Sequence, residues 1–335
     1  MARRFLFILG VSHDYMDMHS KAALPSGVVV RRVTIAAAVA AVLLAATGCL
    51  TPLTSTPPLT PVPTPANPLV GVYEPGAPDS WSRIAEFTDA TGVKPGIVVY
   101  YSSWNQPFST SFAQTAWDHD AYVLVQLEPK GVTLDSIAAG RSDAYLRSYA
   151  DSVRNFRHAV VIGFGHEMNA SWYPWGYKRV PAATFVGAWR HIVTLFRKEG
   201  AQNVTWLWTV NTVQGASSSL SRWWPGAAWT DWTGIAGYYY RATDTFGSVF
   251  GSTIAGIRTV SSAPLLIAET AVGTTADRES QIDALFAGVR ATGLAGVAWF
   301  DAAQHAGLYH QDWRLEDDPA ACAAFTAAVV TYLGG

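Results

Sequence analysis

The stretch AVVIGFGHE, residues 159–167, is an unbroken apolar run that ends in a histidine–glutamate pair. Its first half is rich in β-branched residues and shows no alternation of polar and apolar positions. This pattern is typical of a strand that is buried on both faces. Such strands form parallel sheets whose two faces are both covered by helices. The His–Glu pair then lies at the carboxyl end of the predicted strand.

Seven further runs of this kind occur from residue 69 to the end of the chain. Each is short, continuously apolar and rich in β-branched or aromatic residues, so each is also predicted to be a buried strand. They are LVGVYEPG (69–76), GIVVYYSSW (96–104), YVLVQLEPKG (122–131), NVTWLWTVN (203–211), TGIAGYYYR (233–241), PLLIAETAVG (264–273) and LAGVAWFDA (294–302).

Segments with helical patterns separate these runs. Residues 142–156 begin with a serine cap and carry apolar residues at three- and four-residue spacing. Residues 181–200 start with proline and end in basic residues and glycine, and residues 277–293 and 319–335 are similar. Strands alternating with helices over about 250 residues predict one (β/α)8 TIM barrel over residues 69–335. A doubly wound open sheet is the alternative, but no glycine-rich phosphate loop follows a strand.

Composition narrows the class of partner. The chain of 335 residues has a formal net charge of −2 and a pI near 6.4, which argues against nucleic acid and against an electrostatic membrane patch. It contains 14 Trp, 14 Tyr and 14 Phe. These aromatic side chains can fill a large core, and they can also stack on the flat faces of sugars.

The first 68 residues are expected to lie outside the barrel. Residues 1–49 are interpreted as a leader and signal peptide, since an arginine pair precedes the apolar run VTIAAAVAAVLLAATG. The ending ATGC resembles a bacterial lipobox, so we expect Cys49 to be lipidated; an ordinary cleaved signal is the alternative. Residues 50–68 are rich in proline and threonine and are expected to form an extended linker. The protein would then be extracytoplasmic, bound to the membrane only through this lipid or secreted.

Polar and aromatic residues gather at the carboxyl ends of the predicted strands. In a TIM barrel these ends form one face, where active sites are built from several strands. The residues are Glu74, Trp104, Glu128, His166, Glu167, Asn211, Tyr238, Glu269, Trp299 and Asp301.

Glu167 and Glu269 end two different strands and are predicted to converge on one cleft. Two carboxyl groups can divide the work of glycoside cleavage, one as a protonated acid and the other as an ionised nucleophile. The aromatic residues around Glu167 should raise its pKa by desolvation, which suits the acid. For a retaining mechanism the two carboxyl groups should lie about 5–5.5 Å apart. The competing interpretation is two unrelated carboxylates in structural ion pairs.

Four segments, in order, resemble the catalytic domain of glycoside hydrolase family 26. HEMNASWYPWG (166–176) resembles the acid/base motif of that family, and WWPGAAWTDWTGIAGY (223–238) resembles a downstream segment that ends a strand in Gly-Tyr. IAET (267–270) resembles the nucleophile strand and GVAWFDA (296–302) the eighth strand. The resemblance covers essentially all of residues 69–335.

The resemblance implies a role for each matching residue. Glu167 would be the general acid/base and Glu269 the nucleophile of a retaining mechanism. His166 would help to hold the sugar and the carboxylate network, and Tyr238 would hydrogen-bond near the nucleophile. The remaining candidates for substrate contact are Trp172, Trp299, Trp104 and Asn211.

Two departures from the family pattern bear on the substrate. The family often has arginine three residues before the histidine, where this chain has Gly163, and many of its mannanases read WFWWG where this chain has WYPWG (172–176). The family's commonest activity implies endo-hydrolysis of β-1,4-mannan, with mixed-linkage β-glucan or β-xylan as alternatives. A non-catalytic glycan-binding lipoprotein would have no need of both glutamates. The histidines lack the spacing of metal ligands, so we expect no metal site. We also expect that the protein needs no cofactor and is a monomer.

Overall fold

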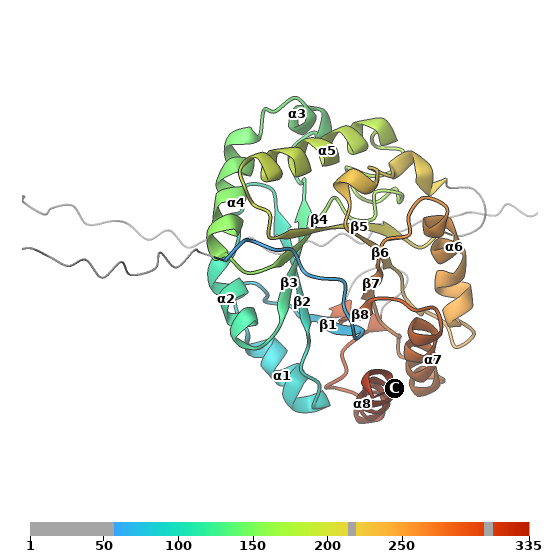
Figure 1. The fold of residues 1–335 in the computed structure, drawn as a ribbon. Coiled ribbons are helices and arrows are strands. Elements are labelled where there is room, and N and C mark those ends of the chain that lie inside the picture. The colour runs from blue at the N-terminus through green and yellow to red at the C-terminus, as the bar shows by residue number, and fades with distance from the viewer. Residues whose placement is uncertain (1–56, 214–218, 305–310, 335) are drawn as a thin grey trace, which may run out of the picture. The chain divides into compact units, whose positions relative to one another are not determined.

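Eight parallel strands close into a barrel, which confirms the predicted fold (Figure 1). The computed structural model describes residues 57–213, 219–304 and 311–334. Each strand pairs with the next along the chain, and the last pairs with the first. The strands are β1 (Leu69–Tyr73), β2 (Ile97–Ser103), β3 (Tyr122–Glu128), β4 (Val160–Phe164), β5 (Val204–Asn211), β6 (Trp232–Ala236), β7 (Leu265–Thr270) and β8 (Gly296–Phe300).

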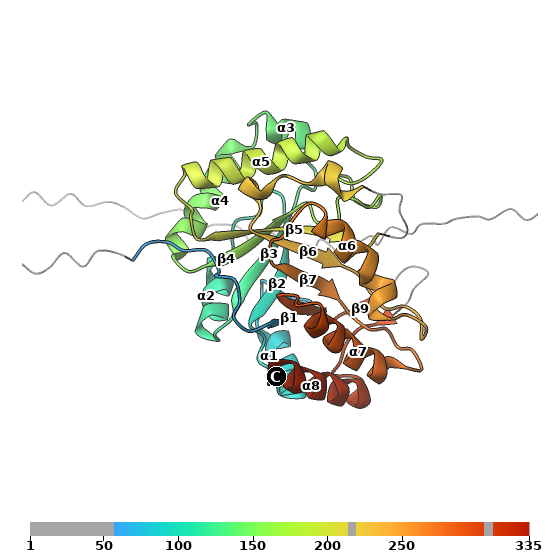
Figure 2. The ribbon, with the colours of Figure 1, turned by 45° about the vertical axis from the view of Figure 1, so that its right-hand side comes forward.

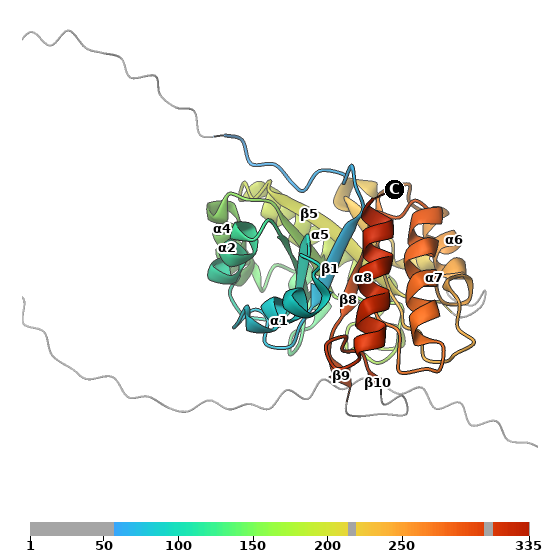
Figure 3. The ribbon, with the colours of Figure 1, turned by 90° about the horizontal axis from the view of Figure 1, so that it is seen from below.

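Helices cover the outside of the barrel, and α7 and α8 lie side by side (Figures 1 and 3). They bury one face each, as α4 does with Leu146, Tyr149 and Val153. Ser142 precedes α4, but the predicted serine cap does not form, because its side chain makes no capping hydrogen bond. The helices are α1 (Ser82–Thr91), α2 (Thr110–Asp118), α3 (Leu134–Ala138), α4 (Asp143–Phe156), α5 (Ala182–Lys198), α6 (Ser252–Arg258), α7 (Arg278–Ala291) and α8 (Pro319–Leu333).

Shorter elements interrupt the alternation of strands and helices. Two 3-10 turns, Leu220–Trp223 and Ala227–Trp229, precede β6, and a π-helical turn, Gly247–Gly251, leads into α6. After β8, the short strands β9 (Ala303–Gln304) and β10 (Gln311–Asp312) pair antiparallel. In the described part of the chain, no helix is both long and apolar enough to cross a membrane.

The amino-terminal end of the barrel is closed by apolar side chains, including that of Val62. Val62 is buried with inward-facing residues such as Val99 and Leu124. Its backbone N–H donates to Thr205 Oγ1 at 2.8 Å. Figure 3 shows this blue segment at one end of the barrel and β9–β10 at the opposite end. This part of the segment expected to be an extended linker therefore packs against the barrel. Cys49 and the rest of residues 1–56 lie outside the described residues.

An irregularity in β7 changes which side chains face the barrel interior. Figure 2 shows β7 beside β6, and the register between them shifts so that Ile235 pairs with Ile267 while Ala236 pairs with Glu269. The register with β8 shifts at the same place. As a result, the consecutive residues Ala268 and Glu269 both face inward, whereas a regular strand would turn one of them outward.

Candidate active site

A tight turn after β4 carries Glu167 into the mouth of the barrel. Glu167 has φ +56° and Gly165 φ +53°, both in the left-handed region. For a glutamate this backbone conformation costs about 1 kcal/mol or more, so surrounding contacts must hold it. The Glu167 N–H donates to Thr209 O at 2.9 Å, and the Glu167 carbonyl accepts from Ala170 N at 2.9 Å.

The carboxyl group of Glu167 is buried among neutral hydrogen-bond donors. Asn211 Nδ2 donates to its Oε1 at 2.6 Å, and Trp172 Nε1 donates to its Oε2 at 2.8 Å. Burial raises the pKa of Glu167 to about 8, with a further contribution from the charge of Glu269; the two hydrogen bonds offset this only in part. Glu167 is therefore protonated at neutral pH, as a general acid must be.

The carboxyl group of Glu269 is held by two phenols. Tyr101 donates its hydroxyl to Oε2, and Tyr238 donates its hydroxyl to Oε1. Burial raises the pKa of Glu269, while these two hydrogen bonds to the charged form lower it. The charge of Glu269 in turn raises the pKa of Glu167 further. Each carboxyl group is thus held by a different pair of neutral donors, an arrangement that can give two carboxyl groups different proton affinities.

Two asparagines fix the position of the acid. Asn169 Nδ2 donates to the Asn211 carbonyl at 2.7 Å, and Asn211 N–H donates to Asn169 Oδ1 at 2.8 Å. This reciprocal pair ties the loop after β4 to the end of β5. Asn211 can then present its amide to Glu167. Asn169 lies in the HEMN motif, but its pairing with Asn211 could not be read from the sequence, because 42 positions separate them.

His166 lies behind the two carboxyl groups, packed among aromatic rings. Its Nε2 is 3.1 Å from the Tyr173 hydroxyl, and its ring centroid is 5.3 Å from that of Tyr101. Trp175 Nε1 donates to the His166 carbonyl at 2.9 Å and stacks on Tyr173. His166 thus contacts the ring that carries one of the Glu269 donors, as expected for part of the carboxylate network.

The structure does not place Trp299 in this site. Ala298 faces the barrel interior, so the next residue faces the helices. Trp299 is 1% exposed, its ring packs against Phe325 of α8, and its Nε1 donates to Asp301 and to the Trp313 carbonyl. The prediction that Trp299 offers a face to a sugar is therefore corrected to a core role.

Trp104 is also a core residue for the most part. It is 7% exposed, and its ring lies 5.0 Å from that of Tyr145 and 6.1 Å from that of Phe164. Tyr145 belongs to α4 and Phe164 to β4, so the Trp104 ring packs where a helix meets the barrel. By contrast, Trp172 and Tyr238 are both partly exposed, and they contact the carboxyl groups of Glu167 and Glu269 directly.

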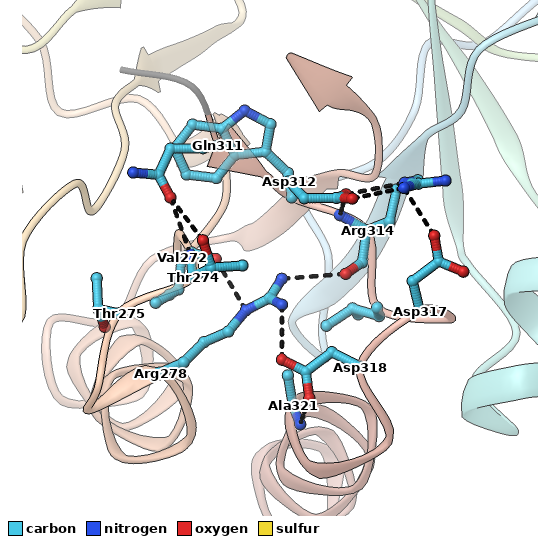
Figure 4. A network of polar contacts seen from close by, with 12 residues as sticks. Val272, Thr274, Thr275, Arg278, Gln311, Asp312, Arg314, Asp317, Asp318 and Ala321 are labelled. Atoms are coloured by element: carbon cyan, nitrogen blue, oxygen red, sulfur yellow. Dashed lines mark hydrogen bonds and ion pairs between the residues drawn. The ribbon is translucent and has the colours of Figure 1, made fainter. Parts of the chain in front are cut away.

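The Tyr238 ring packs against Trp313, whose segment is held in place by a polar network around Arg278. The Trp313 ring lies 4.9 Å from that of Tyr238. The segment that carries Trp313 is held by the buried guanidinium of Arg278, which donates to the Val272 and Arg314 carbonyls and pairs with Asp318 (Figure 4). Trp313 was not identified from the sequence, because no spacing links it to Tyr238.

Gly163 has no side chain, and the side chain of Gln126 occupies the space beside it. A Cβ at this position would lie 2.1 Å from Gln126 Oε1 and 3.3 Å from the Leu207 carbonyl. Gln126 is buried, and its Nε2 is 3.4 Å from Thr209 Oγ1. The place where the family often has an arginine is thus filled by a neutral amide from β3.

We expect Gly163→Ala to destabilise the protein by about 1–3 kcal/mol, because the added methyl group forces Gln126 out of its position. Urea unfolding would measure this loss. The double variant Gly163→Ala/Gln126→Ala should recover most of the lost stability, since the obstructing amide is then gone. A single variant as stable as the wild type would show that Gln126 does not fill this space.

Glu128 adds a third carboxyl group near the site, at the end of β3. Burial raises its pKa, and Lys130 Nζ lies 2.8 Å from its Oε2. Its charge contributes to raising the pKa of both Glu269 and Tyr173, so it lies within electrostatic range of both groups.

Comparison with known proteins places this site in a family. Residues 82–316 match the model of glycosyl hydrolase family 26. Endoglucanase H of Acetivibrio thermocellus is 29% identical over an alignment of 272 residues, and the match covers 76% of this chain but only 29% of that relative's length.

Solved structures of low sequence identity share the fold. An endo-β-1,4-mannanase of Cellulomonas fimi has a TM-score of 0.60 at 16% identity, over 78% of this chain and 70% of that chain. A family 26 β-mannanase of Bacteroides ovatus has a TM-score of 0.57 at 14% identity, over 80% and 91%. The Bacillus subtilis mannanase BCman has a TM-score of 0.55 at 17% identity, over 77% and 84%. Because the family model covers most of the chain, the protein belongs to glycosyl hydrolase family 26.

Proposed function

We propose that this protein is a retaining endo-hydrolase of β-linked polysaccharides, with Glu167 as general acid/base and Glu269 as nucleophile. The observation that carries the proposal is the unequal treatment of two buried carboxyl groups. Glu269 accepts two phenolic hydrogen bonds that favour its charge, while Glu167 has a pKa raised to about 8. At neutral pH one group is ready to attack and the other is ready to donate a proton.

The reaction proceeds in two displacements. In the first, Glu269 attacks the anomeric carbon, the glycosidic C–O bond breaks, and Glu167 gives its proton to the departing oxygen. In the second, Glu167 takes a proton from water, the water oxygen attacks the anomeric carbon, and the bond to Glu269 breaks. Both displacements invert the carbon, so the product keeps the β configuration.

The residues around the two carboxyl groups are suited to holding a sugar. Trp172 is partly exposed beside the acid, so its ring can stack on a sugar face while its N–H stays with Glu167. Tyr101 and Tyr238 keep their protons, because burial and the charge of Glu269 raise the pKa of both well above the usual value. They can therefore orient the nucleophile throughout the pH range of catalysis.

For the substrate, we propose a β-glucan backbone first and β-1,4-mannan second. Mannan is the family's commonest activity, and the similar solved structures named above are mannanases, but they are 14–17% identical. The relative with higher identity, 29%, is named an endoglucanase, although the match covers only part of it. Glucose and mannose differ at one hydroxyl group, and this chain has Gly163 with Gln126 where the family often has an arginine.

Parallel assays of the purified protein on lichenan, glucomannan, galactomannan and xylan test the proposal. A site built to bind one hydroxyl group can reject the epimer by up to about 10⁴-fold. We therefore expect one polysaccharide, lichenan, to be cleaved much faster than the other three. The Glu269→Ala variant prepared in the same way is the control for contaminating activity. Cleavage of galactomannan without cleavage of lichenan would instead indicate that β-1,4-mannan is the substrate. No cleavage of any substrate would favour a glycan-binding protein instead.

We also propose that the protein is lipid-anchored through Cys49 and faces away from the cytoplasm. The proposal rests on the apolar run that ends in ATGC and on the proline-rich segment behind it. Replacing Cys49 with alanine should release the protein from the membrane fraction of the expressing cell, as measured by fractionation and immunoblotting. Full retention of the Cys49→Ala variant in the membrane would contradict the anchor.

A further inference from the structure

Three carboxyl groups that are far apart in sequence meet beside the barrel mouth. Glu74 follows β1, Asp301 follows β8, and Glu316 lies just before α8. Strands β1 and β8 are paired, with Tyr73 opposite Phe300, so the residues that follow them are neighbours. Glu74, Asp301 and Glu316 each offer one carboxylate oxygen, and these oxygens lie within 4.8 Å of one another.

Four carboxyl oxygens of this cluster have no hydrogen bond to a described group outside it. Glu74 is 1% exposed, and among the described residues neither of its carboxyl oxygens has a hydrogen-bond partner outside the cluster. Asp301 is fully buried: its Oδ1 accepts from Leu315 N at 2.9 Å and Trp299 Nε1 at 3.1 Å, whereas its Oδ2 has no such partner within the described part of the chain. Buried oxygens of this kind are costly unless a donor or a cation satisfies them.

The nearby cations do not balance the charge of the cluster. Arg83 lies 2.5 Å from Glu316 Oε1 and 3.7 Å from Glu74 Oε2, and it also pairs with Glu86. Arg314 pairs instead with Asp312 and Asp317. Three carboxylates opposite one guanidinium leave a formal charge of −2.

We propose that Glu74, Asp301 and Glu316 bind one divalent cation, and that calcium is the ion that fits. Calcium prefers oxygen ligands at 2.3–2.6 Å, so ligands on opposite sides of the ion can be about 5 Å apart. One such ion cancels the formal charge of −2. Magnesium requires near-ideal octahedral geometry and retains several waters, which suits this buried cluster less well. Glu316 is the least buried of the three ligands and offers the way in from solvent.

The ion would join three parts of the barrel. It would hold the end of β1, the end of β8 and the segment before α8, which also carries Trp313 behind Tyr238. The expectation of no metal site came from the absence of histidine ligand spacing. Glu74, Asp301 and Glu316 are far apart in the sequence, so no sequence motif predicts that they lie together.

Thermal unfolding of the EDTA-treated, dialysed protein with and without calcium tests the site. At a calcium concentration about 100 times Kd, we expect Tm to rise by roughly 5 °C or more. The double variant Glu74→Gln/Asp301→Asn should show no rise, because the amides keep the shape of the side chains but lose the charges. Potassium chloride at matched ionic strength controls for screening, and Glu279→Gln, an exposed residue of α7, should keep the full rise.

Terbium luminescence gives a second readout that does not depend on stability. Excitation of tryptophan should sensitise bound Tb³⁺, since the Trp299 indole contacts Asp301 directly. Glu316→Gln, at the most accessible ligand, should weaken terbium binding at least tenfold while leaving the fold intact. No calcium response of the wild type at millimolar concentration, or an equal response of the double variant, would overturn the proposal.

Discussion

Replacing Glu269 with alanine is expected to lower kcat on the preferred polysaccharide by about 10⁴-fold or more. Under the proposed mechanism the covalent intermediate cannot form without this carboxylate, which is the group that the hydroxyls of Tyr101 and Tyr238 hold. Steady-state kinetics of the purified variant would measure the loss. The matched control is Glu279→Ala on the surface of α7, which should keep full activity.

Added azide should partly restore the activity of Glu269→Ala and give a glycosyl azide of inverted, α configuration. A small anion can enter the space left by the carboxylate and attack the anomeric carbon, while Glu167 still protonates the leaving oxygen. If Glu269→Ala retained more than a few per cent of wild-type kcat, another residue would have to be the nucleophile.

Replacing Glu167 with alanine is expected to lower kcat/KM on polysaccharides by about 10²–10⁴-fold. The first displacement should be much less affected for a dinitrophenyl glycoside, because that leaving group needs little help from a proton. A loss of equal size on both substrates would contradict the role of Glu167 as the acid.

The pH profile provides a separate test of Glu167. Its pKa is raised to about 8, so the wild type should lose kcat/KM as the pH rises through about 8 and the acid loses its proton. On the dinitrophenyl glycoside, Glu167→Ala should lack this alkaline limb. An unchanged limb in the variant would assign the titration to another group.

The barrel, and the placing of Glu167 and Glu269 at strand ends, could be predicted from the sequence because both rest on local patterns. Continuous apolar runs alternating with helices indicate a parallel barrel, and polar residues at strand ends indicate its active face. Glu167 and Glu269 were both found at such ends, and the structure brings each against donors that the sequence had placed at strand ends, Asn211 and Tyr238.

The errors arose where contacts depend on which way a side chain faces. Trp299 was expected at a sugar but faces α8, because inward-facing Ala298 precedes it. The irregularity in β7 that turns Glu269 inward has no sequence signature. Tyr101 was missed as a donor to Glu269 for a similar reason, since the run IVVYYSS has no alternation to show that Tyr101 faces inward.

The most direct test of the central claim is the configuration of the first product. Proton NMR can follow the anomeric signals while the purified protein cleaves its preferred oligosaccharide, before mutarotation mixes the two anomers. A covalent glycosyl-enzyme at Glu269 predicts that the β-anomer appears first and the α-anomer only later. If the α-anomer appeared first, water would attack directly, and the assignment of Glu269 as nucleophile would be wrong.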